Sequence, residues 1–201
     1  MKVSEIFMSI QGEGRYVGSP QTFIRLSGCN LRCRWCDTKY AYGGGKEMTV
    51  DEIVGKVKEF GLKSVCVTGG EPMLQSKELT QLIKRLKVEG FEIILETNGT
   101  LYDEEVFRIV DCVSLDIKPP SSGEESDIRI LKTLGGKDQV KIVVKDERDY
   151  EFAKEISTKT DLEIILQPEG MKGMRKWCER VLEDRIGFRI LPQMHKVLGL
   201  K

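Results

Sequence analysis

Residues 28–38 of the chain are Gly28-Cys29-Asn30-Leu31-Arg32-Cys33-Arg34-Trp35-Cys36-Asp37-Thr38, and they contain three of its six cysteines within eight residues. Three thiolates on one short loop can hold three irons of a cubane [4Fe-4S] cluster, whereas a closed cluster of this type takes four cysteines. One iron would therefore stay open. An open coordination position is typical of a catalytic rather than a structural metal site. The stretch predicts a catalytic iron-sulfur centre around which the rest of the chain is arranged.

Zinc is the alternative occupant of a cysteine cluster. Zinc sites built on closely spaced cysteines normally recruit a second Cys or His pair, and the sequence has no such pair. The isolated Cys66, Cys112 and Cys178 lie in apolar runs and are expected to be small core residues. Clustered and isolated cysteines in a chain of this length do not resemble a secreted disulfide framework, so thiolate ligands in a reducing compartment are favoured.

Length and charge narrow the class of protein. A chain of 201 residues is long enough for one full hydrophobic core, and we expect a single domain over residues 1–201. The 32 basic and 32 acidic residues cancel, which favours a small-molecule substrate over direct nucleic-acid or membrane-surface binding. The N-terminus lacks the apolar core of a signal peptide, and no apolar run approaches the roughly 20 residues of a membrane span. A cytoplasmic location is expected.

Strand-like runs alternate with amphipathic segments along the chain. Residues 3–26 suggest two strands joined by a Gly-rich loop at residues 11–14, and Thr49 and Glu52 predict a capping box before a helix that ends at Gly61. The expected strands are 22–26, 64–67, 92–96, 112–117, 140–144, 163–166 and 188–191, and the further helices are 77–89, 103–110, 126–134, 148–158 and 174–183. This alternation predicts an α/β fold with a parallel sheet and crossover helices, in a partial or complete β/α barrel.

Polar and Gly-rich clusters follow the predicted strands at the same end each time. They are residues 29–38, 68–72, 96–100, 116–119, 145–146 and 167–170. Reactive groups of β/α barrels lie on the loops at the carboxyl ends of the strands. The clusters are therefore expected to converge on one ligand above the cysteines.

Two motifs together resemble the radical S-adenosylmethionine (SAM) superfamily. They are the Cys-x3-Cys-x-aromatic-Cys spacing, with Trp35 as the aromatic residue, and Thr68-Gly69-Gly70-Glu71-Pro72. Within the superfamily the chain resembles the 7-carboxy-7-deazaguanine synthase family over essentially its whole length. The further motifs are Ser9-Ile10-Gln11-Gly12-Glu13-Gly14, Arg25, Cys36-Asp37-Thr38, residues 116–122, Gln167-Pro168 and His195-Lys196-x-x-Gly199-Leu200.

The resemblance implies a partial β/α TIM-type barrel of the radical SAM type, with a [4Fe-4S] cluster whose open iron chelates SAM. It implies a lyase that converts 6-carboxy-5,6,7,8-tetrahydropterin into 7-carboxy-7-deazaguanine by hydrogen abstraction, ring contraction and loss of ammonia. The product would feed the queuosine and archaeosine modifications of tRNA. Two positions depart from the family: Asp116-Ile117-Lys118 replaces a frequent Ser-Pro-Lys, and Leu200-Lys201 replaces a frequent final Leu-Pro.

The resemblance also implies a role for each matching residue. The cluster would bind Cys29, Cys33 and Cys36. SAM would contact Trp35, Cys36, Asp37, Gly70, Glu96, Asn98, Asp116, Ile117, Lys118, Gln167, Pro168 and Glu169. The pterin would face Ile10, Gln11, Gly12, Arg25, Thr68 and Lys201, with Arg25 suited to a bidentate pair with its carboxylate. Thr38 would bind Mg²⁺ together with substrate oxygens, because Mg²⁺ keeps several waters.

The resemblance also implies binding partners, and it leaves alternative functions to consider. The family implies an external electron donor of the flavodoxin or ferredoxin type and a homodimer. His195, a structural or surface residue by default, lies in a tail that resembles one near the family's site. A glycyl-radical-enzyme activase shares the cysteine spacing and the Thr-Gly-Gly-Glu-Pro motif, but would not need Gln11, Arg25 or the tail. A non-catalytic electron carrier would have no use for a vacant iron or a ring of ligand loops.

Overall fold

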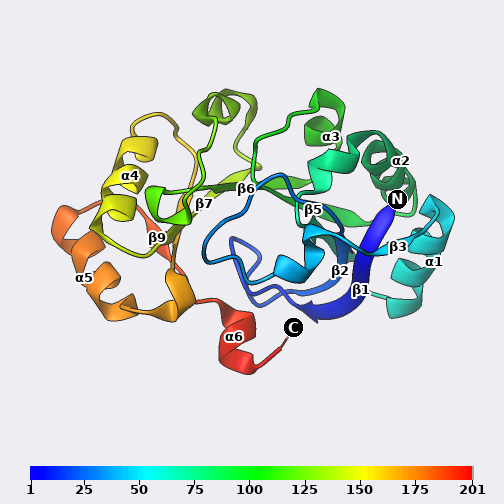
Figure 1. The fold of residues 1–201 in the computed structure, drawn as a ribbon, viewed down its shortest axis with the longest axis horizontal. Helices are drawn as coiled ribbons and strands as arrows, with labels where there is room; N and C mark the ends of the chain where they lie inside the picture. The colour runs from blue at the N-terminus through cyan, green and yellow to red at the C-terminus, as the bar shows by residue number, and fades with distance from the viewer. Residues whose placement is uncertain (201) are drawn as a thin grey trace.

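One nine-stranded sheet organises the chain, of which the computed structural model describes residues 1–200 (Figure 1). The strand order is β3-β1-β2-β4-β5-β6-β7-β8-β9. The strands are β1 (Lys2–Ile10), β2 (Pro20–Leu26), β3 (Lys46–Glu47), β4 (Ser64–Gly69), β5 (Glu92–Thr97), β6 (Cys112–Ile117), β7 (Gln139–Val144), β8 (Ile164–Pro168) and β9 (Arg189–Ile190). Neighbours from β2 to β9 are parallel, whereas β1 runs antiparallel to both β2 and β3. The sheet does not close, which confirms the predicted partial barrel.

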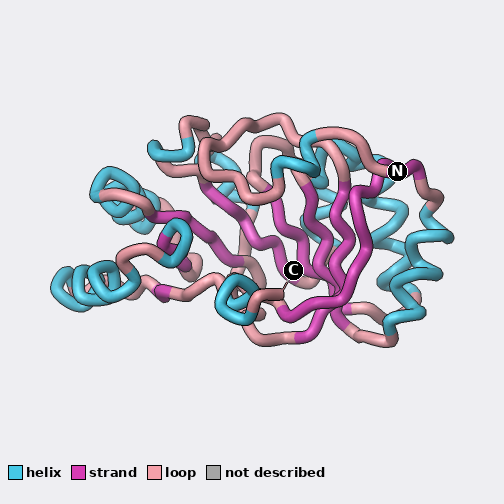
Figure 2. Tube along the Cα trace, turned by 60° about the horizontal axis from the view of Figure 1, so that its bottom comes forward, coloured by secondary structure: helices cyan, strands magenta, loops and turns pink. Residues whose placement is uncertain are grey.

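Most of the helices cover the outer side of the curved sheet, whereas the last helix lies near the C-terminus in contact with β1 (Figures 1 and 2). The helices are α1 (Val50–Phe60), α2 (Ser76–Val88), α3 (Glu104–Ile109), α4 (Glu147–Ser157), α5 (Met174–Asp184) and α6 (Met194–Leu198), with short 3-10 helices at Lys39–Tyr42, Pro72–Gln75, Pro120–Ser122, Ile128–Thr133 and Glu169–Met171. The start and end of α1 agree with the prediction. The Thr49–Glu52 capping box is present, and Gly61 ends the helix in the left-handed region at φ 70°. No helix among residues 1–200 is both long and apolar enough to cross a membrane.

Side chains that alternate along each strand separate the hydrophobic core from the barrel interior. On β7, Val140, Ile142 and Val144 belong to the core cluster packed between the sheet and the helices. The intervening Lys141 and Val143 instead line a cavity on the other face of the sheet. Because side chains of a strand point alternately to opposite faces, the apolar core fixes which residues face the interior.

The predicted α-helix over residues 126–134 is wrong. Residues Ile128–Thr133 form a 3-10 helix, in which only Ile130 and Leu131 are buried. The Asp127 side chain accepts from the backbone N–H of Arg129, and the Thr133 hydroxyl donates to the carbonyl of Ile130. These local bonds favour a tight turn over a longer helix. The last predicted strand is reduced to Arg189–Ile190, and the sequence reasoning missed both β3 and α6.

Candidate active site

A cavity of about 690 Å³ lies where the carboxyl ends of the strands meet the cysteine loop. The expected clusters at the strand ends converge on it. Its wall contains these residues that the sequence singled out: Ile10, Gln11, Gly12, Arg25, Cys29, Cys33, Trp35, Cys36, Asp37, Thr38, Thr68, Gly70, Glu96, Asn98, Asp116, Lys118, Glu169 and His195.

Three of the singled-out residues do not line the cavity. The Ile117 side chain belongs to the core between the sheet and the helices, so only its backbone is left for a ligand. Gln167 and Pro168 are buried at the end of β8. The Gln167 Nε2 atom is buried without a hydrogen-bond partner among residues 1–200. Lys201 lies outside the described residues.

The loop after β4 fixes the start of the cysteine loop. The backbone N–H of Glu71 donates to the carbonyl of Gly28 at 2.7 Å, and the N–H of Gly28 donates to the carbonyl of Ala41 at 2.8 Å. A Cβ on Gly70 would lie 2.2 Å from the Gly28 carbonyl oxygen and 2.8 Å from the Cβ of Cys29. Only glycine permits this approach of the two loops.

The loop after β6 holds the second half of the cysteine loop. The N–H of Arg34 donates to the carbonyl of Ser122 at 2.9 Å, and the indole N–H of Trp35 donates to the Ser121 hydroxyl at 3.2 Å. The Lys118 ammonium lies 5.4 Å from the centre of the Trp35 ring. Trp35 is thereby fixed in the cavity wall between the cysteines and β6.

The arrangement of the cysteines distinguishes between a zinc ion and a [4Fe-4S] cluster, the two occupants that the sequence leaves open. No three Cys, His, Asp or Glu side chains among residues 1–200 converge to hold a single ion. A mononuclear zinc site requires such convergence, whereas a cubane cluster presents a separate iron to each thiolate. Burial raises the pKa of Cys29, and it raises the pKa of Cys33 to about 11, so cluster ligation has to displace protons from these thiols. Three cysteines on one loop and in one cavity wall fit the cluster.

Glu71 is a fully buried carboxylate that joins the loops after β4 and β5. It accepts hydrogen bonds from the N–H of Met73 at 2.9 Å, the Thr97 hydroxyl at 2.8 Å and the N–H of Asn98 at 2.7 Å. Burial raises the pKa of Glu71 although these bonds oppose the change. The Asn98 amide donates in turn to Asn30 Oδ1 at 3.1 Å, which connects β5 to the cysteine loop. Glu71 is therefore a scaffold residue beneath the site.

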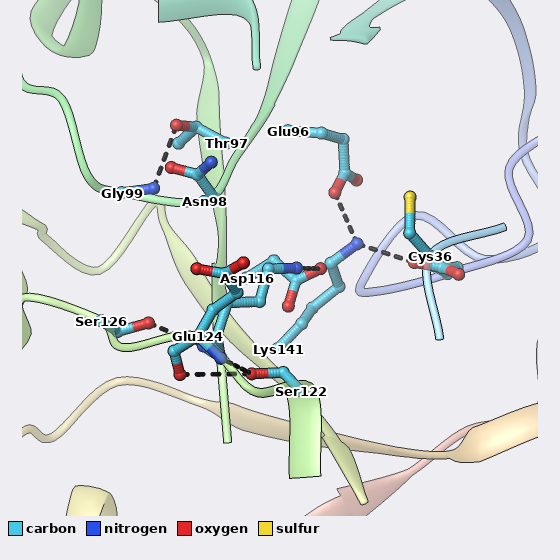
Figure 3. A network of polar contacts seen from close by, with 12 residues as sticks. Cys36, Glu96, Thr97, Asn98, Gly99, Asp116, Ser122, Glu124, Ser126 and Lys141 are labelled. Carbon is cyan, nitrogen blue, oxygen red and sulfur yellow. Dashed lines mark hydrogen bonds and ion pairs between the residues drawn. The ribbon is translucent and has the colours of Figure 1, made fainter. Parts of the chain in front are cut away.

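An ion triad of the buried Lys141 with the partly buried Glu13 and Glu96 crosses the cavity, and Figure 3 shows its Lys141–Glu96 pair. The ammonium of Lys141, a residue only 3% exposed, lies 2.8 Å from Glu13 Oε2 and 2.5 Å from Glu96 Oε2. Burial opposes the ionisation of Glu13, but Lys141 and the amide of Gln193 outweigh it and lower its pKa to about 2. Burial raises the pKa of Glu96 in spite of Lys141. Sequence reasoning missed Lys141; the available signal was a lone charge at an inward position of an apolar strand.

Asp116 offers an unused acceptor in the same wall. Its Oδ2 pairs with the Lys118 ammonium at 2.8 Å, whereas its buried Oδ1 has no hydrogen-bond partner among residues 1–200. Burial lowers the pKa of Lys118, but the neighbouring Asp116 carboxylate outweighs it, and the net shift is upward. Buried acceptors are rarely left unpaired, so a ligand hydroxyl or amine is the expected partner of Asp116.

The C-terminal segment lies against the loop between β1 and β2 (Figure 1). The N–H of Met194 donates to the carbonyl of Gly12 at 2.9 Å. A Cβ on Gly12 would lie 2.0 Å from His195 Nδ1, so Gly12 serves close packing of the tail as well as the cavity wall. The Gln193 amide donates to Glu13 Oε1 at 2.7 Å, and Lys196 Nζ donates to Gln193 Oε1 at 2.6 Å. Sequence reasoning named Lys196 only as part of the C-terminal motif and did not identify Gln193.

Arg25 and Thr38 complete the wall on the side of β1. Arg25 Nε lies 2.9 Å from Glu5 Oε1, which also accepts from the Tyr40 hydroxyl at 2.7 Å. The guanidinium lies 5.9 Å from the centre of the Tyr40 ring. Thr38 Oγ1 lies 3.6 Å from Cys36 Sγ, which places a hydroxyl directly beside a cluster cysteine.

Comparison with known proteins agrees with this geometry. Residues 23–166 match the family model described as the radical SAM superfamily. The chain is 39% identical to the 7-carboxy-7-deazaguanine synthase of Thermoplasma acidophilum, over 98% of this chain and 97% of that protein. It is 40% identical to the enzyme of the same name from Methanospirillum hungatei JF-1, over 100% of this chain and 86% of that protein.

Two solved structures are similar to this chain. QueE from Escherichia coli matches with a TM-score of 0.77 and 27% identity, over 96% of this chain and 94% of that one. Streptococcus suis SuiB bound to S-adenosylmethionine matches with a TM-score of 0.61 over 82% of this chain and 48% of that one, and at 12% identity it shows the fold alone. The chain belongs to the radical SAM superfamily and, within it, to the 7-carboxy-7-deazaguanine synthase family.

Proposed function

We propose that the chain is a 7-carboxy-7-deazaguanine synthase, a lyase that acts on 6-carboxy-5,6,7,8-tetrahydropterin with a [4Fe-4S] cluster, SAM and Mg²⁺. The observation that carries the proposal is that the three cysteines, Glu96 and Arg25 line one cavity. The activase alternative has no use for Gln11, Arg25 or the tail, and all three contribute to this wall. The product would enter queuosine or archaeosine biosynthesis in the cytoplasm.

The cofactors would bind on the side of the cysteine loop. Cys29, Cys33 and Cys36 would hold the cluster, and bound cluster and SAM together supply a carbon-centred radical for hydrogen abstraction. The SAM ligands would be Trp35, Cys36, Asp37, Gly70, Glu96, Asn98, Asp116, Lys118 and Glu169, with buried Ile117, Gln167 and Pro168 contributing through backbone or amide atoms. The unpartnered Oδ1 of Asp116 and Nε2 of Gln167 support a polar ligand here.

The pterin would lie toward β1 and β2. Arg25 would pair with the substrate carboxylate, since its guanidinium lies in the cavity wall and carries several N–H donors suited to a bidentate pair. Ile10, Gln11, Gly12 and Thr68 would surround the ring, and the C-terminal Lys201 would face it from the tail. Holding the substrate in a walled cavity keeps water away from the reactive intermediates.

Thr38 is the residue of this chain that would hold magnesium. Thr38 supplies one neutral oxygen in the cavity wall, and the substrate carboxylate and waters would supply the others. The ion would orient the substrate and stabilise negative charge during the rearrangement.

The remaining partners are a reductant and a second copy. A flavodoxin- or ferredoxin-type protein would deliver the electron to the cluster. Residues 1–201 would act as one domain within a homodimer. Exposed apolar side chains of Met8 on β1 and of Val197 and Leu198 on α6, two elements in contact, support an interface at this side.

The decisive experiment is anaerobic reconstitution with iron and sulfide, followed by SAM, Mg²⁺, a reductant and the carboxytetrahydropterin. Mass spectrometry should detect 7-carboxy-7-deazaguanine and 5'-deoxyadenosine. SAM cleavage without the deazaguanine would refute the substrate and leave the superfamily intact.

A further inference from the structure

Lys141 makes contacts that neither the motifs nor the family comparison assigned. We propose that Lys141 is a positioning residue of this cavity. Its ammonium holds the Glu13 and Glu96 carboxylates together, and it thereby fixes the position of Glu96 on the SAM side and of Glu13 on the substrate side. The inference rests on the proposed function. It adds to that function a residue that acts through its two carboxylate partners.

Three separate elements meet at the Lys141 ammonium. Lys141 comes from β7, Glu96 from the end of β5 and Glu13 from the loop between β1 and β2, and both contacts are short, at 2.5 and 2.8 Å. Figure 3 shows the lysine side chain extended toward Glu96 across the cavity. Its neighbours Val140 and Ile142 are anchored in the core, so the backbone of β7 fixes the position of the ammonium.

The charge balance explains why one cation matters. Lys141 faces two carboxylates, and the other charged or titratable groups near them include the Asp116–Lys118 pair, Cys66 beside Glu96, and His195 beside Glu13. Lys118 is already paired with Asp116 at 2.8 Å. Without Lys141, Glu13 and Glu96 would be neighbouring, partly buried carboxylates with no other cation in direct contact among residues 1–200, and two like charges in one site repel each other.

The triad continues into the C-terminal segment. Glu13 accepts from Gln193, Gln193 accepts from Lys196, and Lys196 pairs with Asp37 beside the cysteines. A displaced Glu13 would therefore release the tail that covers Gly12 at the substrate side. Movement of Glu96 would disturb the SAM side, so loss of Lys141 should weaken both ligands.

A purely structural lysine is the alternative, and the chain offers a matched control. Lys137 also makes short bonds, at 2.8 Å to the carbonyl of Phe107 and 2.6 Å to that of Val110. Lys137 does not line the cavity and touches no carboxylate there. Lys137→Met removes a structural lysine without touching the site.

The test compares Lys141→Met, Lys141→Arg, Glu13→Gln/Lys141→Met and Lys137→Met in the reconstituted protein. The measurements are the melting temperature, the cluster absorbance, the SAM dissociation constant without reductant, and KM for the carboxytetrahydropterin. Lys141→Met should weaken SAM binding and raise KM by about tenfold or more, a typical loss for a group that supports ligand residues. Lys141→Arg should restore part of both, whereas Lys137→Met should melt earlier but bind both ligands like the wild type.

The double variant addresses the charge argument and the risk of misfolding. Glu13→Gln/Lys141→Met removes one of the two orphaned anions, so it should be more stable than Lys141→Met and bind SAM more tightly. Cluster-loaded Lys141→Met that binds both ligands within about twofold of the wild type overturns the proposal. If Lys141→Met does not fold, a double variant that binds SAM more weakly than Lys137→Met supports the proposal, and one that binds SAM like Lys137→Met and the wild type overturns it. SAM affinity is independent of the pterin assignment, so failure of the proposed function remains distinguishable.

Discussion

The Lys196 ammonium on α6 lies 2.9 Å from Oδ2 of Asp37, the residue that follows the third cysteine of the loop. The Lys196 side chain is 34% exposed and that of Asp37 is 51% exposed. Exposed ion pairs contribute about 1 kcal/mol or less to stability. The main effect of the pair is therefore to hold the C-terminal tail in place over the substrate side of the cavity.

Lys196→Met should raise KM for the pterin several-fold while the cluster content and the melting temperature stay near those of the wild type. Steady-state kinetics under anaerobic conditions measures the change. Lys176→Met is the control. It removes an exposed ion pair between Lys176 on α5 and Glu147 on α4. An unchanged KM in Lys196→Met would separate the tail from substrate binding.

Gly70→Ala should impair cluster retention. The added Cβ would lie 2.2 Å from the backbone oxygen of Gly28, which cannot move without shifting the cysteine loop. Absorbance and iron content after gel filtration report the loss. Gly55→Ala in α1 adds the same methyl group in open space and should stabilise the protein by about 0.5–1 kcal/mol, because alanine is the better helix former.

Cys33→Ala should abolish both the cluster and SAM cleavage, since the loop of residues 28–38 has no fourth cysteine to replace it. Cys178→Ala should keep both, because Cys178 is exposed on α5; the expectation that it belongs to the core was wrong, whereas Cys66 and Cys112 are buried as expected. Iron analysis and assay of 5'-deoxyadenosine check the pair of variants. A Cys33→Ala protein with an intact cluster would mean that the ligand assignment is wrong.

Thr38→Ala should weaken the dependence of product formation on Mg²⁺, and Thr38→Ser should preserve it, because serine keeps the coordinating hydroxyl. The measurement is the rate of product formation against Mg²⁺ concentration. The apparent affinity for Mg²⁺ should fall about tenfold in the alanine variant. Equal Mg²⁺ curves for the two variants would remove Thr38 from the metal site.

Local chemistry explains what the sequence alone could predict. The cysteine loop and Gly70 follow strands, and Glu96 lies at the end of one. The strands themselves follow from apolar alternation, so their common edge could be inferred. The α1 capping box is equally local. Each of these features depends on residues close together in the chain.

The features that escaped prediction depend on contacts between distant residues. Lys141 gains its importance from Glu13, 128 positions away, and Gln193 meets Glu13 across 180 positions. Gly12 was expected to face the pterin, but its packing against His195 appears only in the fold. The segment Ile128–Thr133 has the apolar spacing of a helix, and local hydrogen bonds of Asp127 and Thr133 turned it into a 3-10 helix.

The pH dependence of stability gives a final prediction for the Lys141 triad. In the wild type the pKa of Glu13 is lowered from 4.5 to about 2, so the stability it contributes is complete above pH 4.5 and is lost as the pH falls toward 2. Without Lys141, burial should raise the pKa of Glu13 above its value in the unfolded chain, and it should raise the pKa of Glu96, which is already elevated in the wild type, still further. The folded variant then takes up protons first, and its stability increases as the pH falls through those raised pKa values.

The destabilisation of Lys141→Met relative to the wild type should therefore be largest at neutral pH, at about 3 kcal/mol, the lower end for a broken buried pair. It should shrink by at least about 1 kcal/mol by pH 4, since one pKa unit corresponds to about 1.4 kcal/mol. Urea unfolding at several pH values measures the difference. Lys137→Met loses bonds to carbonyl oxygens, which do not titrate, so its destabilisation should be constant over the same range. A constant destabilisation of Lys141→Met as well would show that Lys141 stabilises the fold by packing rather than by its charge.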